Sequence, residues 1–206
     1  PPALPIASRG GSLVLPTAVR ATYAAPGRGE RELVWRLAGG RYRMRWTLDE
    51  AALSESARGS LSWSGLLPLQ YSRRAGGLEQ SADFDWARLR STGLVEASLD
   101  ATTLDPASLA MQIAVAHQWL DQAARRAGWV VQVLGRGRAG VHEIDAGAAG
   151  PVYQLDWPDL ATDDEARLVE LELAPEHGFL PKRLRERQRA GELVWRLAAV
   201  ENLPVE

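Results

Sequence analysis

The three histidines are the first side chains to consider for metal binding or for proton transfer near neutral pH. His117, His142 and His177 lie far apart and show none of the short spacings typical of metal ligands. Glu143 and Asp145 follow His142, but consecutive residues of a strand point to opposite faces. A zinc site on one face of this strand could therefore use His142 but not Glu143. The alternative is that these residues lie in a solvated loop or at a sheet edge. Because the chain has no cysteine, thiolate sites are excluded as well, and we predict no metal site.

Other catalytic patterns are incomplete. Residues 62–65 read Ser-Trp-Ser-Gly and lack the first glycine of a serine nucleophile elbow. The glycines of residues 135–140 fall between two expected strands and open no helix, which favours a hairpin turn over a phosphate-binding loop. Asp83 and Asp85 share a strand face, as paired acid–base carboxylates would, but they alternate with aromatic residues and are expected to face solvent. We therefore predict no catalytic residue, no cofactor and no enzymatic activity.

Tryptophan is the unusual residue type, because eight tryptophans outnumber two phenylalanines. Most of them fall at the inward-facing positions of their expected strands. They either fill the core or line a cavity for a small apolar ligand, as indoles on a curved sheet can do. The candidate ligand-binding residues are Trp35, Met44, Trp46, Trp63, Trp86, Trp119 and Trp195.

The elements that position these residues read mainly as β-strands. The clearest strand alternates Tyr42, Met44, Trp46 and Leu48 with arginines at positions 41, 43 and 45. Gly39-Gly40 and Gly76-Gly77 are typical of two-residue hairpin turns. The segment ELVWRLA occurs at residues 32–38 and again at 192–198, so an early and a late strand are expected to present similar surfaces to one core.

One segment departs from the two-residue period. Asp105-Pro106 is typical of a helix start, and no glycine follows until Gly128, which predicts a helix to about residue 126. The apolar arc of this helix is wide, so we expect it to pack inside a concave sheet. His117 falls on the narrow polar arc and is expected at the surface.

Composition limits the class of protein. The 206 residues fit one all-β domain, with residues 1–12 as a flexible lead-in and 13–206 as a single half-barrel domain. The net charge is −2, and arginines are interleaved with acids along the chain, which argues against nucleic acid. No apolar run approaches the ~20 residues that span a bilayer. The chain begins at Pro1 without a methionine, so we expect any signal peptide or anchor to precede it.

Four segments together resemble a known family. They are GLLPLQY at residues 65–71, FDW at 84–86, DPASL at 105–109 and FLPKR at 179–183. In this order and spacing they resemble the bacterial family known as domain of unknown function 3108, over about residues 17–201. The resemblance implies export to the periplasm or cell envelope, often behind an amino-terminal anchor. It also implies an architecture similar to the periplasmic lipoprotein carriers, in which a β half-barrel holds acyl chains beneath a helical lid.

Three functional hypotheses follow, all for a chain expected to be a monomer. The first is a non-enzymatic envelope protein, periplasmic or anchored facing the periplasm, that binds a lipid or another apolar or amphipathic small molecule. The second is a scaffold with a filled core that recruits an envelope protein partner. The third is a cell-wall hydrolase, which requires two carboxylates or a histidine–carboxylate pair in a cleft. A hollow space between sheet and helix would favour the first hypothesis.

Overall fold

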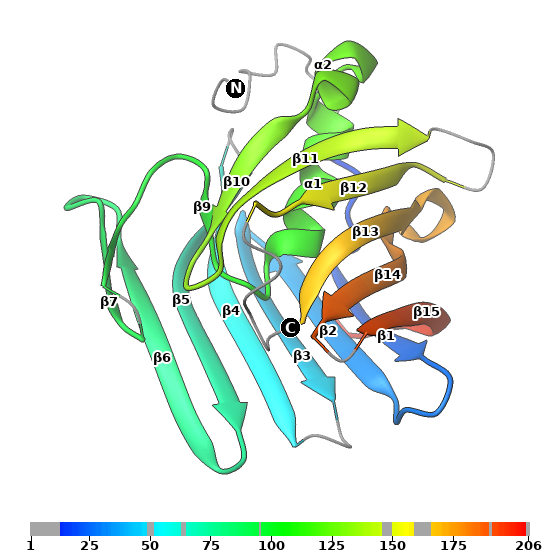
Figure 1. Ribbon diagram of the computed structural model, residues 1–206, viewed down its shortest axis with the longest axis horizontal. Helices are drawn as coiled ribbons and strands as arrows, with labels where there is room; N and C mark the ends of the chain where they lie inside the picture. The colour runs from blue at the N-terminus through cyan, green and yellow to red at the C-terminus, as the bar shows by residue number, and fades with distance from the viewer. Residues whose placement is uncertain are drawn as a thin grey trace.

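The computed structural model describes residues 13–48, 52–62, 65–94, 96–145, 150–158, 166–189 and 191–204. The lead-in expected at residues 1–12 and the candidate ligand residue Trp63 lie outside the described residues. Within these ranges, fifteen strands join into one sheet that curves around a central helix (Figure 1).

Along the chain, nine strands come first, the two α-helices follow, and six more strands with one 3₁₀ helix complete the described residues. The first half of the chain forms the strands β1 Ala18–Ala24, β2 Arg31–Ala38, β3 Arg41–Leu48, β4 Leu53–Ser62, β5 Gly65–Ala75, β6 Leu78–Asp85, β7 Arg90–Gly93, β8 Ala97–Ser98 and β9 Thr103–Leu104. The helices α1 Leu109–Trp119 and α2 Gln122–Ala127 follow. The second half forms β10 Trp129–Val133, β11 Gly137–Asp145, β12 Val152–Asp156, β13 Arg167–Ala174, the short 3₁₀ helix η3 Pro175–His177, β14 Leu180–Gln188 and β15 Gly191–Asn202.

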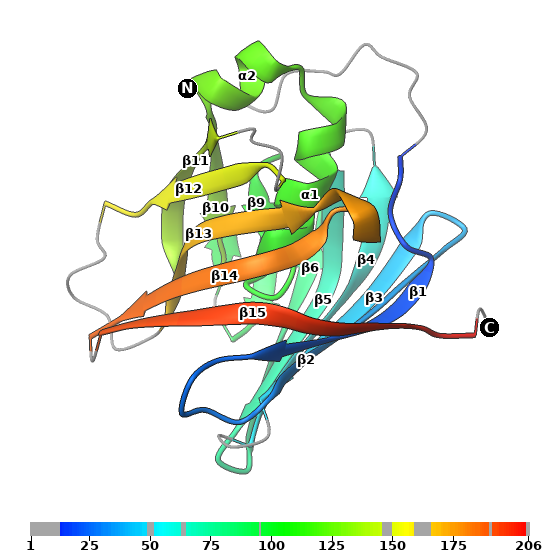
Figure 2. The same cartoon turned by 90° about the vertical axis from the view of Figure 1, so that its right-hand side faces the viewer.

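The strands follow one another around the sheet in the order β8-β7-β6-β5-β4-β3-β2-β1-β15-β14-β13-β12-β11-β10-β9. The pairings are antiparallel except for the short contact of β9 with β10, which is parallel. In the described chain β8 and β9 end the sheet, so it remains open, with α1 on its concave side (Figure 2). The predicted fold, mainly β with one curved sheet and a helix in its concave face, is confirmed.

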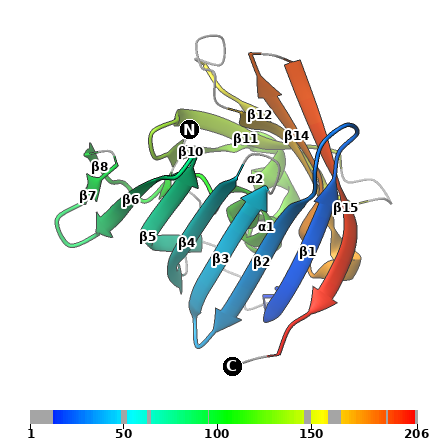
Figure 3. The ribbon, with the colours of Figure 1, turned by 90° about the horizontal axis from the view of Figure 1, so that it is seen from below.

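The first and last long strands meet at the middle of the sheet, because β1 pairs with β2 on one side and with β15 on the other. The two ELVWRLA segments therefore lie one strand apart, in β2 and β15. Their tryptophans, Trp35 and Trp195, are both buried on the concave side. Figure 3 shows β1 to β5 side by side as one wall, with β15 continuing beyond β1.

The alternation predicted for β3 is present residue by residue. Tyr42, Met44 and Trp46 are buried, and the arginines between them are exposed. The hairpin before β3 is also as predicted, since Gly39 and Gly40 have φ angles of 54° and 72°. Positive φ at both central residues matches the twist of paired strands, and glycine adopts it at low cost.

The helical segment differs from the prediction, because it forms two helices and starts later. The Asp105 carboxylate accepts hydrogen bonds from the Ser108 amide and hydroxyl at 2.9 and 2.7 Å, so residues 105–108 form a capped turn before α1. Leu120 is extended, and Asp121 caps α2 by accepting from the Ala124 amide at 2.8 Å. The turn at Asp105 thus delays the start of α1, and the cap at Asp121 divides the expected continuous helix in two.

Helix α1 is fixed to the sheet by polar contacts as well as by its buried face. The Gln112 side chain accepts a hydrogen bond from the Leu66 amide at 2.7 Å, and the Trp46 indole donates to the Ala107 carbonyl at 3.1 Å. Gly65 has a φ of 122°, and a Cβ there would lie 2.2 Å from Gln112 Nε2. The φ angle favours glycine at this position, and a larger residue would also displace the Gln112 amide that bonds to Leu66.

Candidate functional site

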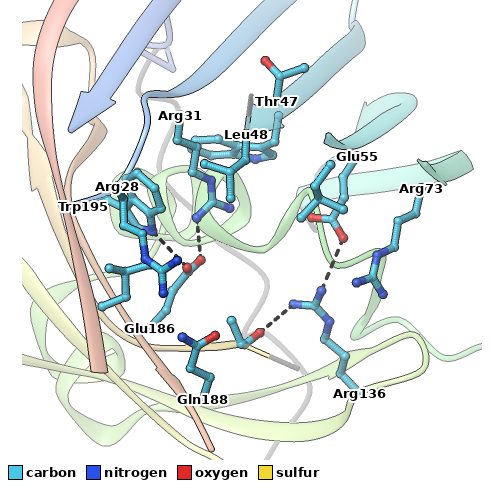
Figure 4. A pocket seen from close by; sticks show the side chains of 14 residues that line it. Arg28, Arg31, Thr47, Leu48, Glu55, Arg73, Arg136, Glu186, Gln188 and Trp195 are labelled. Carbon is cyan, nitrogen blue, oxygen red and sulfur yellow. Dashed lines mark hydrogen bonds and ion pairs between the residues drawn. The ribbon is translucent and has the colours of Figure 1, made fainter. Parts of the chain in front are cut away.

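A cavity of about 560 Å³ lies at one end of the half-barrel. Its walls come from loops and strand ends that meet there: the β1–β2 connection and the start of β2, the end of β3, the start of β4, the end of β5, the β10–β11 turn, Ala166 before β13, and the parts of β14 and β15 nearest their hairpin. No residue of α1 is among those that line the described cavity. Figure 4 shows the lining side chains.

An arginine between two indoles stands at the centre of the cavity. The guanidinium carbon of Arg31 lies 4.5 Å from the centre of the Trp46 ring and 5.8 Å from that of Trp195. Arg31 Nη1 donates to Glu186 Oε1 at 2.6 Å, and the Trp195 indole donates to the other oxygen of Glu186 at 3.1 Å. Burial opposes the charge of Arg31, but the adjacent Glu186 carboxylate raises its pKa above the usual value, so the guanidinium stays protonated.

A second charged cluster forms the opposite side of the cavity. Glu55 is buried and accepts a hydrogen bond from the Tyr71 hydroxyl at 2.7 Å. Arg136 Nη2 approaches the same Glu55 oxygen at 3.3 Å, and its Nη1 donates to the Ala166 carbonyl, also at 3.3 Å. These contacts hold the β10–β11 turn against β4 across the mouth of the cavity (Figure 4).

The lining has an excess of positive charge. Among the described residues it carries four guanidinium groups (Arg28, Arg31, Arg73, Arg136) and two carboxylates (Glu55, Glu186), an excess of two. Apolar walls accompany these charges, and they consist of Trp46, Leu48, Leu53, Leu193 and Trp195. The cavity can therefore accept a molecule with an apolar part and an anionic group.

The structure brings two of the seven candidate ligand residues into this cavity, Trp46 and Trp195. Trp35 and Met44 lie in the core instead, and Trp35 stacks on Tyr42 with ring centres 5.7 Å apart. Trp86 packs on Phe84 at the end of β6, and the half-buried Trp119 ends α1. None of these four residues is among those that line the described cavity, and Trp63 lies outside the described residues.

The sequence analysis did not identify the charged residues of the cavity, although their positions in the alternation of the strands place them on the inward face. Arg31 shares the inward phase with Leu33 and Trp35 in β2, and Glu186 shares it with Leu184 in β14. A charged residue at an inward position near a strand end is typical of a polar site at the mouth of a barrel.

A polar cluster lies away from the cavity, where α1 and α2 meet the sheet. His117 Nδ1 is 2.7 Å from the Tyr153 hydroxyl, which donates to Glu143 at 3.2 Å, and Arg125 pairs with the same carboxylate. Burial lowers the pKa of His117 to about 4, with Arg125 adding to the effect. The expectation of a surface histidine and a solvated Glu143 was wrong, because α2 folds back and covers both. The cluster joins α1, α2, β11 and β12, a structural role.

No group of three or more His, Asp or Glu side chains within the described ranges is arranged to hold a metal ion. None of the helices described is both long and apolar enough to cross a membrane.

Comparisons with known proteins support the fold and no more. No protein-family model matches the chain, and a search of the curated proteins returns no significant match. Among solved structures, a β-barrel-like protein of domain of unknown function 1849 from Brucella abortus matches with a TM-score of 0.53 and 9% identity, over 93% of this chain and 100% of that chain. The hypothetical protein CT021 from Chlamydia trachomatis matches with a TM-score of 0.27 and 7% identity, over 94% of this chain and 91% of that chain. The resemblance to family 3108 and to the lipoprotein carriers is not confirmed, and this chain shares its β-barrel-like fold with an uncharacterised domain.

Proposed function

We propose that this protein is a non-catalytic binding protein that holds an amphipathic molecule with an anionic head group in the cavity around Arg31. The observation that carries the proposal is the pairing of guanidinium groups and indoles in one hollow space. Its volume of about 560 Å³ lies within the range of small-molecule sites. A scaffold with a filled core would not require such a space.

The charges of the lining favour an anionic ligand. Arg31 and Arg136 are each engaged with a carboxylate, and with Arg28 and Arg73 the lining carries four guanidinium groups against two carboxylates. A guanidinium binds carboxylate and phosphate oxygens in a bidentate manner, and the pairing is stronger where water is partly excluded. We therefore place the head group beside Arg31, within the excess of positive charge, and the apolar part against Leu48, Leu53 and Leu193.

The two carboxylates are less suited to hydrolysis. Glu55 and Glu186 both face the cavity, but each is held by an arginine and by a second hydrogen bond, from the Tyr71 hydroxyl to Glu55 and from the Trp195 indole to Glu186. A glycoside hydrolase needs one carboxyl group that stays protonated and gives its proton to the leaving group. This arrangement supports binding over the hydrolase hypothesis.

Intrinsic fluorescence can test the proposal, because Trp46 and Trp195 both line the site. We expect dodecanoate to change the emission in a saturable manner and dodecanol, with the same chain length, to bind at least about tenfold more weakly, equivalent to ~1.4 kcal/mol. The Trp46→Phe/Trp195→Phe variant should lose most of the signal, and Trp119→Phe serves as the control. Equal affinity for the acid and the alcohol, or no saturable change with either, would reject the anionic-ligand proposal.

A location in the cell envelope remains a prediction that depends on the resemblance stated above. Fractionation of cells that express the complete gene product, with periplasmic and cytoplasmic marker proteins, tests it. Recovery with the cytoplasmic marker would contradict it.

A further inference from the structure

Five arginines gather on the outer face of the sheet, the face turned away from α1. This outer arginine patch consists of Arg36 in β2, Arg41, Arg43 and Arg45 in β3, and Arg58 in β4. All except the half-buried Arg36 are exposed. The patch follows from the alternation of β3, because burial of Tyr42, Met44 and Trp46 turns the three arginines between them outward.

The strand register concentrates these charges. Arg43 lies directly opposite Arg36 on one side and Arg58 on the other, so three guanidinium groups form a row across three strands. This row spans ~10 Å, and the β3 arginines extend ~13 Å along the strand. Acids and arginines are interleaved along the chain, but the strand register brings arginines of separate strands side by side.

The patch is not neutralised by neighbouring acids. No ion pair joins an acidic side chain to Arg41, Arg43, Arg45 or Arg58 in the described part of the chain. Glu30 and Glu32 line a pocket together with Arg45 at one end of the patch, but Glu32 pairs with Arg20 at 2.9 Å. Asp83, near Arg58, accepts a hydrogen bond from Gln70 at 3.0 Å. Like charges placed opposite one another weaken a sheet, so the patch opposes folding and is not explained by stability.

The outer face of β13 and β14 provides the contrast. There Glu170 and Glu172 form ion pairs of 2.8 to 3.2 Å with Lys182, Arg183 and Arg185. The same sheet thus pairs its basic residues with acids at one place and leaves them unpaired at another. The patch is also not a result of overall charge, since the chain is net negative.

A shallow groove of about 290 Å³ lies within the patch, between Arg43 and Arg58. The hydroxyls of Ser56 and Ser72, which lie 2.8 Å apart, line it together with the Gln70 side chain. Two guanidinium groups with neighbouring hydroxyl and amide donors form the set of groups that binds an oxyanion such as a phosphate.

We propose that the outer arginine patch binds the anionic surface of a lipid bilayer, with one head-group phosphate in the groove between Arg43 and Arg58. A bilayer presents many phosphates in one plane, which suits charges spread over a sheet face, and clusters of basic residues are attracted to anionic lipid. Nucleic acid fits less well. The outward residues described in β2, β3 and β4 include no aromatic side chain on which a base could stack, and a sheet face does not enter a groove. The proposal does not depend on the ligand of the cavity.

Vesicle sedimentation tests the proposal with the whole chain. We expect the protein to sediment with vesicles of phosphatidylcholine and phosphatidylglycerol at 70:30, and not with phosphatidylcholine alone, and to be released as salt rises. The Arg43→Gln/Arg58→Gln variant should lower the partition coefficient about 25-fold, or about fivefold for each arginine. Both residues are exposed, so circular dichroism should report an unchanged fold.

The control variant Arg88→Gln/Arg138→Gln changes the net charge by the same amount at exposed arginines outside the patch. It should alter the partition coefficient less than twofold. Equal losses in the two double variants would reduce the effect to net charge and overturn the proposal. Absence of binding to anionic vesicles would also overturn it. If the protein instead bound a 20-base oligonucleotide through Arg43 and Arg58 and did not bind vesicles, the patch would be a nucleic-acid site. The Arg31→Met variant of the cavity should bind vesicles normally, which separates this test from that of the proposed function.

Discussion

Arg31 and Glu186, which are 155 positions apart in the chain, form an ion pair of 2.6 Å at the centre of the cavity. Their side chains are only 16% and 14% exposed, so each charge depends on the other to offset the loss of water. The pair links the start of β2 to the end of β14 and places a positive charge between two indoles. It is therefore both a structural contact and the centre of the proposed binding site.

A double-mutant cycle separates these two roles. Arg31→Met should lower the free energy of unfolding by about 3 kcal/mol, because it leaves Glu186 partly buried without its partner. Glu186→Gln should cost less than Arg31→Met, and the double variant should recover part of the loss. Urea denaturation at pH 7 measures all four proteins. Strict additivity of the two single changes would contradict a coupled pair.

We expect Glu186→Gln and Arg31→Met to change the affinity for dodecanoate in opposite directions. Glu186→Gln raises the positive excess of the lining from two to three charges and should strengthen dodecanoate binding, whereas Arg31→Met should weaken it about tenfold or more. Isothermal titration calorimetry measures both. A weakening in both variants would indicate that shape alone, and not charge, controls the site.

Filling the cavity should abolish binding without damage to the fold. Leu193 lines the cavity and is half-buried, so Leu193→Trp places an indole in existing empty space. We expect the dodecanoate affinity to fall at least about tenfold and the melting temperature to stay constant or rise slightly. Leu89→Trp is the matched control, because Leu89 is exposed and lies away from the cavity. Unchanged affinity in Leu193→Trp would place the ligand elsewhere.

Asp105 should give the protein a stability that falls as the pH rises from about 4 to 7. Burial raises the pKa of this carboxyl from its usual 3.8 to about 7 in the folded state. Between these values the folded chain binds more protons than the unfolded chain, so folding is favoured at the acid end of the window and less favoured above pH 7. Asp105→Asn keeps an oxygen that can accept from Ser108 and removes the charge.

This variant should be more stable than the natural chain at pH 8, on the order of 2 kcal/mol, and near equal to it at pH 4.5. Thermal unfolding at the two pH values makes the comparison. Asp121→Asn serves as the control, because Asp121 is an exposed helix cap. A variant that is less stable at both pH values would show that the hydrogen bonds outweigh the cost of the buried charge.

Gly65 should be the most sensitive of the described glycines that approach α1. Gly65→Ala adds a Cβ that would lie 2.2 Å from Gln112 Nε2, at a φ of 122° that other residues rarely adopt. We expect a loss of about 2–4 kcal/mol in the free energy of unfolding. Gly40→Ala, which also has a positive φ but open space around it, should cost only about 1 kcal/mol. Guanidinium denaturation measures both variants. Equal losses of unfolding free energy in the two would show that the positive φ angle, and not the contact with Gln112, determines the cost.

The sequence by itself determined the local geometry of this protein. The alternation of β3 specified which side chains are buried, and Gly39-Gly40 specified the hairpin before it, because the two-residue period and positive φ are properties of neighbouring residues. The wide apolar arc of the helical segment correctly indicated burial inside a concave sheet. The division of that segment at Leu120 was harder to predict, because the cap at Asp121 and the helix propensity of the surrounding residues are competing effects of about 1 kcal/mol each.

Only the tertiary structure decided which charged residues meet. Arg31 and Glu186 belong to strands at opposite ends of the chain, and Arg36, Arg43 and Arg58 become one row only through the register of three strands. A sequence pattern tells which face a side chain takes, but not which distant side chain shares that face. The cavity and the arginine patch depend on these long-range pairings, because charge interactions follow distance in space and not separation along the chain.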